Sequence, residues 1–215
     1  MKAIIAGSSG MIGNLVLTNC LNADKITEVR SLVRKPTGLT HKKLIEIVIE
    51  NFEDFSTHED LFKDVSAAFF CLGVYTGQVP DDPFKKITVN YAVEFAQTLK
   101  KNSPQATLCL LSGAGADRTE QSKTSFARYK GMAENQIAEM DLKFHSFRPG
   151  YIYPVEPRKE PNIGYKIMKA LYPIFKLSGD KYSIKSTDLA NAMFNVGLNG
   201  AAEQILENQD ILKYK

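Results

Sequence analysis

A tyrosine and a lysine stand side by side in "SFARYKGMAE", residues 125–134, and lysine and tyrosine are side chains that can transfer protons. Residues four apart on a helix share one face, because four residues advance about 400° around the axis. The position four residues before Lys130 holds Phe126, whereas Tyr129 lies about 100° from Lys130 around the helix. We therefore expect Lys130 to be available for chemistry and the ring of Tyr129 to pack elsewhere, on a neighbouring helix or a groove rim.

A glycine pattern follows the first apolar segment of the chain. "GSSGMIG" places Gly7, Gly10 and Gly13 at three-residue spacing, where a strand runs into a helix expected over 11–21. Glycines at these positions allow a tight turn and a close approach to a pyrophosphate, and the helix N-terminus attracts an anion. The pattern predicts a dinucleotide site. The alternative is a tight turn with a close contact between helix and strand and no ligand.

The end of the second expected strand, "SLVRKP", suggests which dinucleotide binds. A protein that holds NAD usually has an acidic residue here, which accepts hydrogen bonds from the adenosine ribose. This chain has Arg34 and Lys35 instead, and Glu28 stands at the far end of the strand. Two cations suit a 2′-phosphate, so we expect NADP(H) to be preferred over NAD(H). The alternative is a solvated basic loop.

Other chemical groups have less support. Tyr75, Tyr151 and Tyr153 carry hydroxyls that could approach a nicotinamide, but such aromatic residues more often pack in a cap. The three histidines are isolated, without a second ligand at metal spacing, and the chain lacks the Gly-x-Ser-x-Gly segment of a hydrolase. We expect no metal site.

Six short apolar segments are expected to be strands, with helices between most of them. They are Lys2–Ala6, Glu28–Val33, Leu44–Ile49, Ala67–Leu72, Thr107–Leu111 and Lys143–Phe147. Continuously apolar strands separated by helices specify a parallel sheet with both faces covered, which is the doubly wound α/β architecture of the Rossmann fold. One helix is expected to start at Phe84, with Asp82 as its cap and Pro83 in its first turn.

The pattern changes after Phe147. Residues 148–165 carry four prolines and two glycines, which predicts a loop. An amphipathic run over 163–176 follows, and then a helix capped by Ser186 or Thr187 that ends near Asn199 and Gly200. We expect one domain, residues 1–215, in which residues 151–215 form a small cap on the substrate side of the sheet.

The composition excludes several classes of protein. The chain has 215 residues, 44% of them hydrophobic, and its net charge of +3 comes from basic and acidic residues spread along the sequence. Without a basic stripe, nucleic acid is not an expected partner. No apolar run approaches the ~20 residues of a membrane span, and "MKAIIAG" predicts a strand at the start rather than a signal peptide. The three cysteines suit a reducing compartment, so we expect a cytoplasmic monomer or homodimer.

A series of short stretches resembles one protein family. "GSSGMIG", "LVRKP", "NFEDF", "FFCLGVYTG", "LLSGAGAD", "KGMAE" and "FRPG" occur in family order over about the first 150 residues. The chain resembles the atypical short-chain dehydrogenase/reductases, and in particular the Tat-interacting oxidoreductase-like family and its bacterial relatives. Beyond Gly150 the resemblance is limited to "TDLANAM" and "QILEN", so it does not identify a substrate.

The resemblance implies which residues contact the cofactor. The pyrophosphate would lie against Gly7, Ser8, Ser9, Gly10, Met11, Ile12 and Gly13, the 2′-phosphate against Arg34 and Lys35, the adenine against Asn51 and Phe52, the ribose against Cys71, Leu72 and Gly73, and the nicotinamide against Pro149 and Gly150. Asn51 replaces an aspartate common in the family, and an amide can still bond an adenine edge.

The resemblance also implies catalytic positions. Lys130 matches the lysine that holds the nicotinamide ribose, and Ser112 is the candidate for the hydroxyl that orients the substrate, but Phe126 occupies the place of the tyrosine acid. Two functions remain open. One is an NADPH-dependent reductase acting on a quinone, a flavin or another small acceptor that needs no positioned tyrosine. The other is a protein that senses NADP(H) without turnover.

Overall fold

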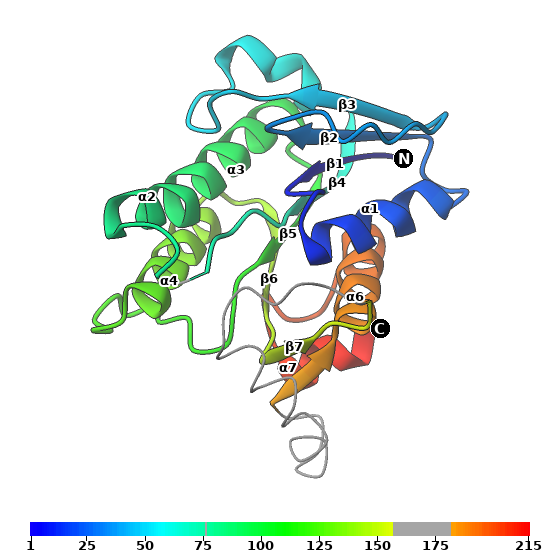
Figure 1. Ribbon diagram of the computed structural model, residues 1–215. Coiled ribbons are helices and arrows are strands. Elements are labelled where there is room, and N and C mark those ends of the chain that lie inside the picture. Colours follow the sequence, from blue (N-terminus) through cyan, green and yellow to red (C-terminus); the bar gives the residue numbers. More distant parts are fainter. Residues whose placement is uncertain (76, 157–181) are drawn as a thin grey trace.

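The computed structural model of the chain describes residues 1–75, 77–156 and 182–215 (Figure 1). Its main sheet has the strand order β3-β2-β1-β4-β5-β6-β9, and every pairing is parallel. The strands are β1 (Lys2–Ala6), β2 (Glu28–Val33), β3 (Leu44–Val48), β4 (Val65–Phe70), β5 (Thr107–Leu111), β6 (Lys143–Arg148) and β9 (Ile205–Glu207). The order reverses between β1 and β4, which confirms the doubly wound architecture and marks the place where such sheets bind ligands.

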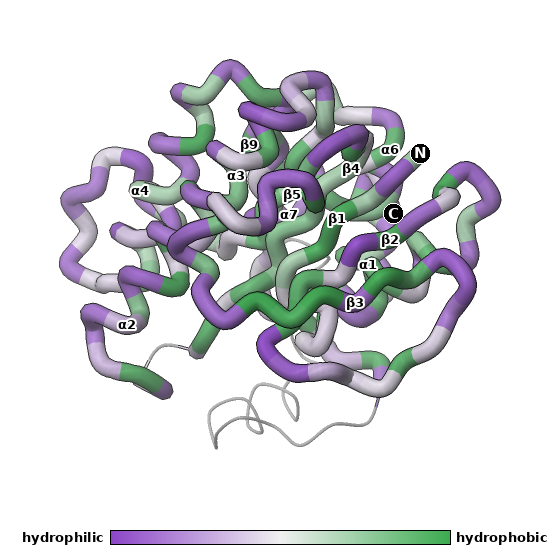
Figure 2. Tube along the Cα trace, turned by 90° about the horizontal axis from the view of Figure 1, so that it is seen from above, coloured by the Kyte–Doolittle hydropathy of each residue, from purple (hydrophilic) through white to green (hydrophobic). Residues whose placement is uncertain are grey.

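Helices cover both faces of the sheet. Figure 1 shows α1 (Met11–Asn22) and α6 (Ser186–Asn199) on one side, and α3 (Tyr91–Asn102) and α4 (Ser125–Ala138) on the other. Successive residues of a strand point to opposite faces, so Ala3 and Ile5 of β1 join the core under α1 while Ile4 and Ala6 join the core under α3. Figure 2 shows hydrophobic residues along these central strands and hydrophilic residues mostly on outer loops.

The helix expected from Phe84 begins earlier. It starts as α2 (Asp81–Lys85) with Pro80 at the N-cap, continues through a π-helical turn over Lys86–Asn90, and runs on as α3. Asp82 therefore lies inside the first turn, where the positive end of the helix dipole stabilises its carboxylate. The prediction that Asp82 caps the helix was wrong. Strand β4 also differs from expectation, because it ends at Phe70 and leaves Cys71 and Leu72 in the loop that follows.

The C-terminal third only partly resembles the expected cap. Residues 151–153 form strand β7 (Tyr151–Tyr153), which pairs in parallel with β8 (Ser183–Lys185), so the prediction of a loop throughout 148–165 was wrong. The pairing partner of β7 lies about thirty residues further along the chain, and its own short sequence carries no local signal of it. The amphipathic run expected over 163–176 lies outside the described residues.

Helix α6 and strand β9 belong to the body of the sheet rather than to a cap. Helix α6 packs on α1, and β9 extends the sheet beside β6. The expected end of α6 is confirmed, since the Gly200 amide donates to the Val196 carbonyl at 2.7 Å and Gly200 has φ +76°. Its start is not capped by a side chain, because Ser186 Oγ instead accepts from the Val155 amide at 3.1 Å. After β9 the chain forms α7 (Asn208–Ile211) and a final 3₁₀ turn, Leu212–Tyr214.

Candidate functional site

The glycine turn after β1 is packed against the neighbouring strand. Gly7 has φ +90°, and a Cβ there would lie 2.6 Å from the Cys71 carbonyl carbon. A Cβ on Gly13 would lie 2.2 Å from the Gly7 carbonyl oxygen, while the Gly10 amide donates to that same oxygen at 3.0 Å. The turn thus requires glycine, and the first turn of α1, which has no acidic residue, faces the switch point of the sheet. This geometry suits a pyrophosphate.

A shallow second cavity of about 490 Å³ lies beside the glycine turn and the end of β2. Its lining includes the predicted residues Ser8 and Ser9, together with Thr37 of the loop after β2. Arg34 and Lys35, which precede that loop, are exposed immediately after β2. The lining of this cavity thus includes the hydroxyl groups of Ser8, Ser9 and Thr37, but neither Arg34 nor Lys35 is part of it.

Two acidic residues of strands β2 and β3 already have partners. Glu28 lies at the start of β2, at the opposite end of the strand from this cavity, and accepts a hydrogen bond from Arg30 Nε at 2.7 Å. Glu46 on β3 accepts from both the amide and the hydroxyl of Thr37, at 2.8 and 2.6 Å. Glu46 thus holds the loop of Thr37, a role that the sequence did not indicate.

The predicted adenine residues have different environments. Asn51 is exposed, and its Oδ1 accepts from the Glu53 amide at 3.0 Å, forming a local turn. The ring of Phe52 is 2% exposed and packs edge-on against Phe55, with 5.9 Å between ring centroids. Phe52 therefore belongs to the core, and neither Asn51 nor Phe52 lines either of the two cavities.

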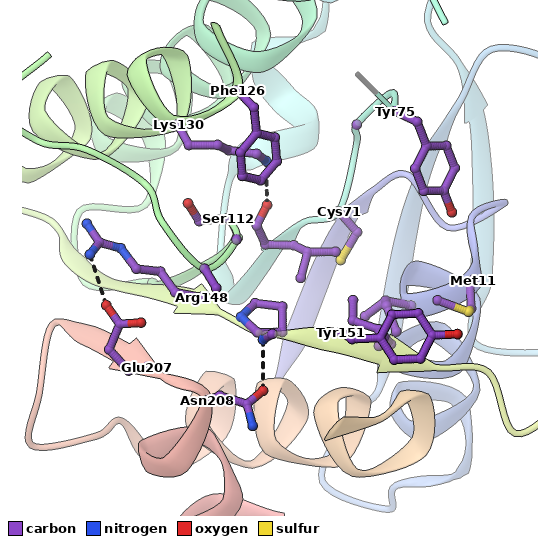
Figure 3. Close-up of a pocket in the computed structure, with 18 of the residues that line it drawn as sticks. Met11, Cys71, Tyr75, Ser112, Phe126, Lys130, Arg148, Tyr151, Glu207 and Asn208 are labelled. Atoms are coloured by element: carbon purple, nitrogen blue, oxygen red, sulfur yellow. Dashed lines mark hydrogen bonds and ion pairs between the residues drawn. The ribbon is translucent and has the colours of Figure 1, made fainter. Parts of the chain in front are cut away.

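A larger cavity of about 910 Å³ opens at the carboxyl ends of β1, β4, β5 and β6 (Figure 3). It brings together predicted residues from five separate segments of the chain. They are Gly10, Met11, Ile12, Cys71, Leu72, Gly73, Ser112, Lys130, Pro149 and Gly150. Its size falls in the range of small-molecule and cofactor sites.

Lys130 and Phe126 both face this cavity from α4, as their four-residue spacing predicts. Lys130 Nζ donates a hydrogen bond to the Leu111 carbonyl oxygen at 2.9 Å. Burial lowers the pKa of Lys130 to about 8, against the opposing effect of the nearby Glu134 carboxylate and the Cys71 thiol. The pKa of the Lys130 amine therefore lies close enough to neutral pH for the amine to exchange its proton there.

The ring of Phe126 occupies the place where a side chain after Ser112 would point. A Cβ on Gly113 would lie 2.6 Å from Phe126 Cζ. A side chain at 113 would therefore require this ring to move. Phe126 and Gly113 thus form one packing arrangement.

Tyr129 points away from the cavity, as expected. It is 6% exposed, its hydroxyl donates to the Asp81 carboxylate, and its ring packs on Phe84 with 5.9 Å between centroids. It does not line either cavity. Tyr129 therefore links α4 to α2 and is not placed to serve as an acid.

A buried ionic network that the sequence analysis missed underlies the cavity wall. Glu134, with 0% exposure, accepts hydrogen bonds from Ser112 Oγ and Ser146 Oγ, both at 2.7 Å, and from Arg148. Arg148 also donates to Glu207 at 3.0 Å, and its two carboxylate partners raise its pKa. The hydroxyl of Ser112 is thus directed at Glu134. The one available signal was Glu134 itself, an acid four residues after Lys130 on the same helix face.

The C-terminal residues complete the opposite wall of the cavity. Asn208 Oδ1 accepts from the Gly150 amide at 2.8 Å (Figure 3). Asn208 Nδ2 donates to the Ser183 carbonyl at 3.0 Å. A Cβ on Gly150 would lie 2.2 Å from the Tyr182 carbonyl oxygen, so the close packing of this segment requires glycine. Asn208 was missed because no local motif links it to Gly150, 58 residues earlier.

Cys71 is the one cysteine that lines the cavity, and burial raises the pKa of its thiol to about 12. It is therefore a thiol rather than a nucleophilic thiolate near neutral pH. Within 1–75, 77–156 and 182–215 there is no group of three or more metal-ligating side chains. No helix in the described part of the chain is long and apolar enough to cross a membrane.

Comparisons with known proteins agree with this geometry. Residues 7–197 match the protein family described as NAD(P)H-binding. The fold is similar to the Bordetella bronchiseptica enzyme WbmG in complex with NAD, with TM-score 0.71 and 15% identity over 96% of this chain and 72% of that one. It is also similar to a glucuronic acid dehydrogenase from Chromohalobacter salexigens, with TM-score 0.70 and 12% identity over 99% and 83% of the two chains. No curated protein sequence matches the chain. The expected dinucleotide-binding fold is confirmed.

Proposed function

The chain belongs to the NAD(P)H-binding family, and on that premise we propose that it is an NADPH-dependent oxidoreductase. Its acceptor is a small molecule, such as a quinone or a flavin, that is reduced without a tyrosine general acid. The observation that carries this proposal is the single cavity lined by the start of α1, by Lys130 and by Gly150. A dinucleotide bound along these residues would present its nicotinamide ring to the remaining space, where it supplies a hydride.

The preference for NADPH rests on the end of β2. Arg34 and Lys35 are exposed immediately after β2, shortly before Thr37 of the small cavity, and Glu46 is already bonded to Thr37. A guanidinium can hold a phosphate through two parallel hydrogen bonds, which the unphosphorylated cofactor cannot match.

The proposed class of acceptor rests on the walls of the large cavity. Phe126, Tyr75 and Tyr151 contribute rings to a lining in which many residues are apolar. These walls suit a planar aromatic acceptor. The place where related enzymes position a tyrosine hydroxyl is filled by the Phe126 ring against Gly113, so the acceptor is one that does not rely on that hydroxyl.

The second candidate, a sensor of NADP(H) without turnover, is favoured by the partners of the expected catalytic hydroxyls. Ser112 Oγ donates to Glu134, and the Tyr129 hydroxyl donates to Asp81 outside the cavity. Under this alternative, cofactor binding would stabilise one arrangement of the cavity walls and change affinity for a partner.

One pair of measurements separates the two. Nicotinamide fluorescence gives the dissociation constants of NADPH and NADH, and absorbance follows NADPH oxidation with quinones, flavins and aldehydes. Oxidation with a quinone or flavin supports the reductase, whereas tight binding without oxidation by any acceptor supports the sensor. Failure to bind either dinucleotide would contradict both.

A further inference from the structure

We propose that Lys130 Nζ is the proton donor to the acceptor, in place of the tyrosine that this chain lacks. This inference rests on the proposed reductase function and assigns the proton to one atom. Lys130 has three N–H groups when charged, and the Leu111 carbonyl takes one of them at 2.9 Å. The amine lines the large cavity beside the Phe126 ring, so its remaining protons are within the space where an acceptor would lie.

The other candidate groups on the same side of the cavity are committed elsewhere. Ser112 directs its hydroxyl at the buried Glu134. Arg148 is held by Glu134 and Glu207, and a guanidinium does not release its proton in proteins. Figure 3 shows the rings of Tyr75 and Tyr151 beside Met11, apart from Lys130. These two tyrosines are the competitors that an experiment must exclude.

The surroundings of Lys130 adjust it to this role. Burial lowers its pKa to about 8, and the two titratable groups that face it, Glu134 on α4 and Cys71 after β4, oppose this effect. A general acid is most effective when its pKa lies near the working pH, because a large fraction is then protonated and the proton is still readily transferred. An exposed lysine, with a pKa of about 10.4, would be a much weaker acid.

The step balances as follows. The acceptor gains a hydride from NADPH at one atom and a proton from Lys130 Nζ at its oxygen or nitrogen, so the acceptor is reduced by two electrons and NADPH is oxidised. The N–H bond of Lys130 breaks with its electron pair remaining on nitrogen, and a new O–H or N–H bond forms on the acceptor. The neutral amine then regains a proton from water.

Lys130→Arg is the most direct test, because it keeps a positive charge and hydrogen-bond donors but gives up no proton. We expect its NADPH dissociation constant to stay within about threefold of wild type, while kcat falls about 100-fold. Wild-type kcat should decline as the pH rises through about 8, since the neutral amine has no proton to give, and Lys130→Arg should lack this decline. Lys130→Met should regain activity with added alkylammonium ions. Exposed Lys123 supplies the control, Lys123→Met.

A readout independent of turnover is the pH dependence of acetylation at each lysine, measured by mass spectrometry. Lys130 should react half-maximally near pH 8. A Lys130 midpoint at the ordinary lysine value of about 10.4, or Lys130→Arg turnover within threefold of wild type, would overturn the inference alone. If Tyr75→Phe or Tyr151→Phe lost as much kcat as Lys130→Arg, that tyrosine rather than Lys130 would be the proton donor. Absence of NADPH oxidation in the wild type would overturn the proposed function as well.

Discussion

Phe126 and Gly113 are in contact across the cavity wall, so closely that a Cβ on Gly113 would lie 2.6 Å from Phe126 Cζ. The residue at the place of the usual tyrosine and the residue after Ser112 therefore constrain each other. A hydroxyl side chain at 113 and the aromatic ring at 126 cannot both occupy this space unless one of them moves. This relationship leads to the first two predictions.

Gly113→Ala should destabilise the protein by about 1–3 kcal/mol, the usual cost of forcing an extra carbon into a packed site. In a Phe126→Ala background the same substitution should cost much less, because the ring that it meets is gone. Urea unfolding of the two single variants and the double variant measures this coupling. Strictly additive costs would show that Gly113 and Phe126 do not compete for space.

Phe126→Tyr should add a proton donor on the face of α4 that carries Lys130. The new hydroxyl would extend from Cζ, the atom nearest Gly113, so the ring must shift, and we expect a gain of only about tenfold in carbonyl reduction. The gain should be largest above pH 8, where Lys130 is mostly neutral. NADPH oxidation with aldehydes and quinones at two pH values checks this, and a gain confined to low pH would contradict it.

Arg34→Ala should weaken NADPH binding by about 1.5–3 kcal/mol, or roughly ten- to a hundredfold, and leave NADH binding unchanged. The reason is that the guanidinium is proposed to meet only the 2′-phosphate. Fluorescence titration with both cofactors measures the difference, with Lys25→Ala, an exposed lysine before β2, as the control. Equal losses of affinity for NADPH and NADH would show that Arg34 does not contact the 2′-phosphate.

Lys130→Met should be more stable than wild type at pH 7. Since burial holds the pKa of Lys130 near 8, below its unfolded value, the unfolded chain binds the proton more tightly and the charged lysine costs stability below pH 8. The stability of the wild type should rise as the pH increases from about 8 to 10, because Lys130 becomes neutral in both states. The difference between the melting temperatures of Lys130→Met and wild type should therefore shrink by about 2–4 °C or more over this range. A difference that is constant across this range would mean that Lys130 titrates normally.

Glu134→Gln should lower stability by about 3 kcal/mol, because it removes the buried charge that balances Arg148 and places an amide against two serine hydroxyl donors. Glu207 remains as a partner but is half exposed. Urea unfolding against Glu139→Gln, at an exposed position after α4, checks the effect. Equal stability of the two variants would show that the network contributes little.

Features that depend on neighbouring residues could be predicted from the amino-acid sequence. Alternating apolar strands and helices specified the parallel sheet, and the glycine spacing specified the turn between β1 and α1, because both depend on residues close together in the chain. The four-residue spacing of Phe126 and Lys130 also placed both on one helix face, and the same count correctly turned Tyr129 away from it.

Features that join distant segments of the chain could not be predicted from the sequence and are visible only in the folded structure. Strand β9 lies beside β6, Asn208 holds Gly150, and Glu134 gathers Ser112 and Arg148 from two neighbouring strand ends. Each contact links residues from 14 to about 60 positions apart, and no pattern within one segment specifies its distant partner. The lowered pKa of Lys130 has the same origin, because it arises from the burial that these segments create together.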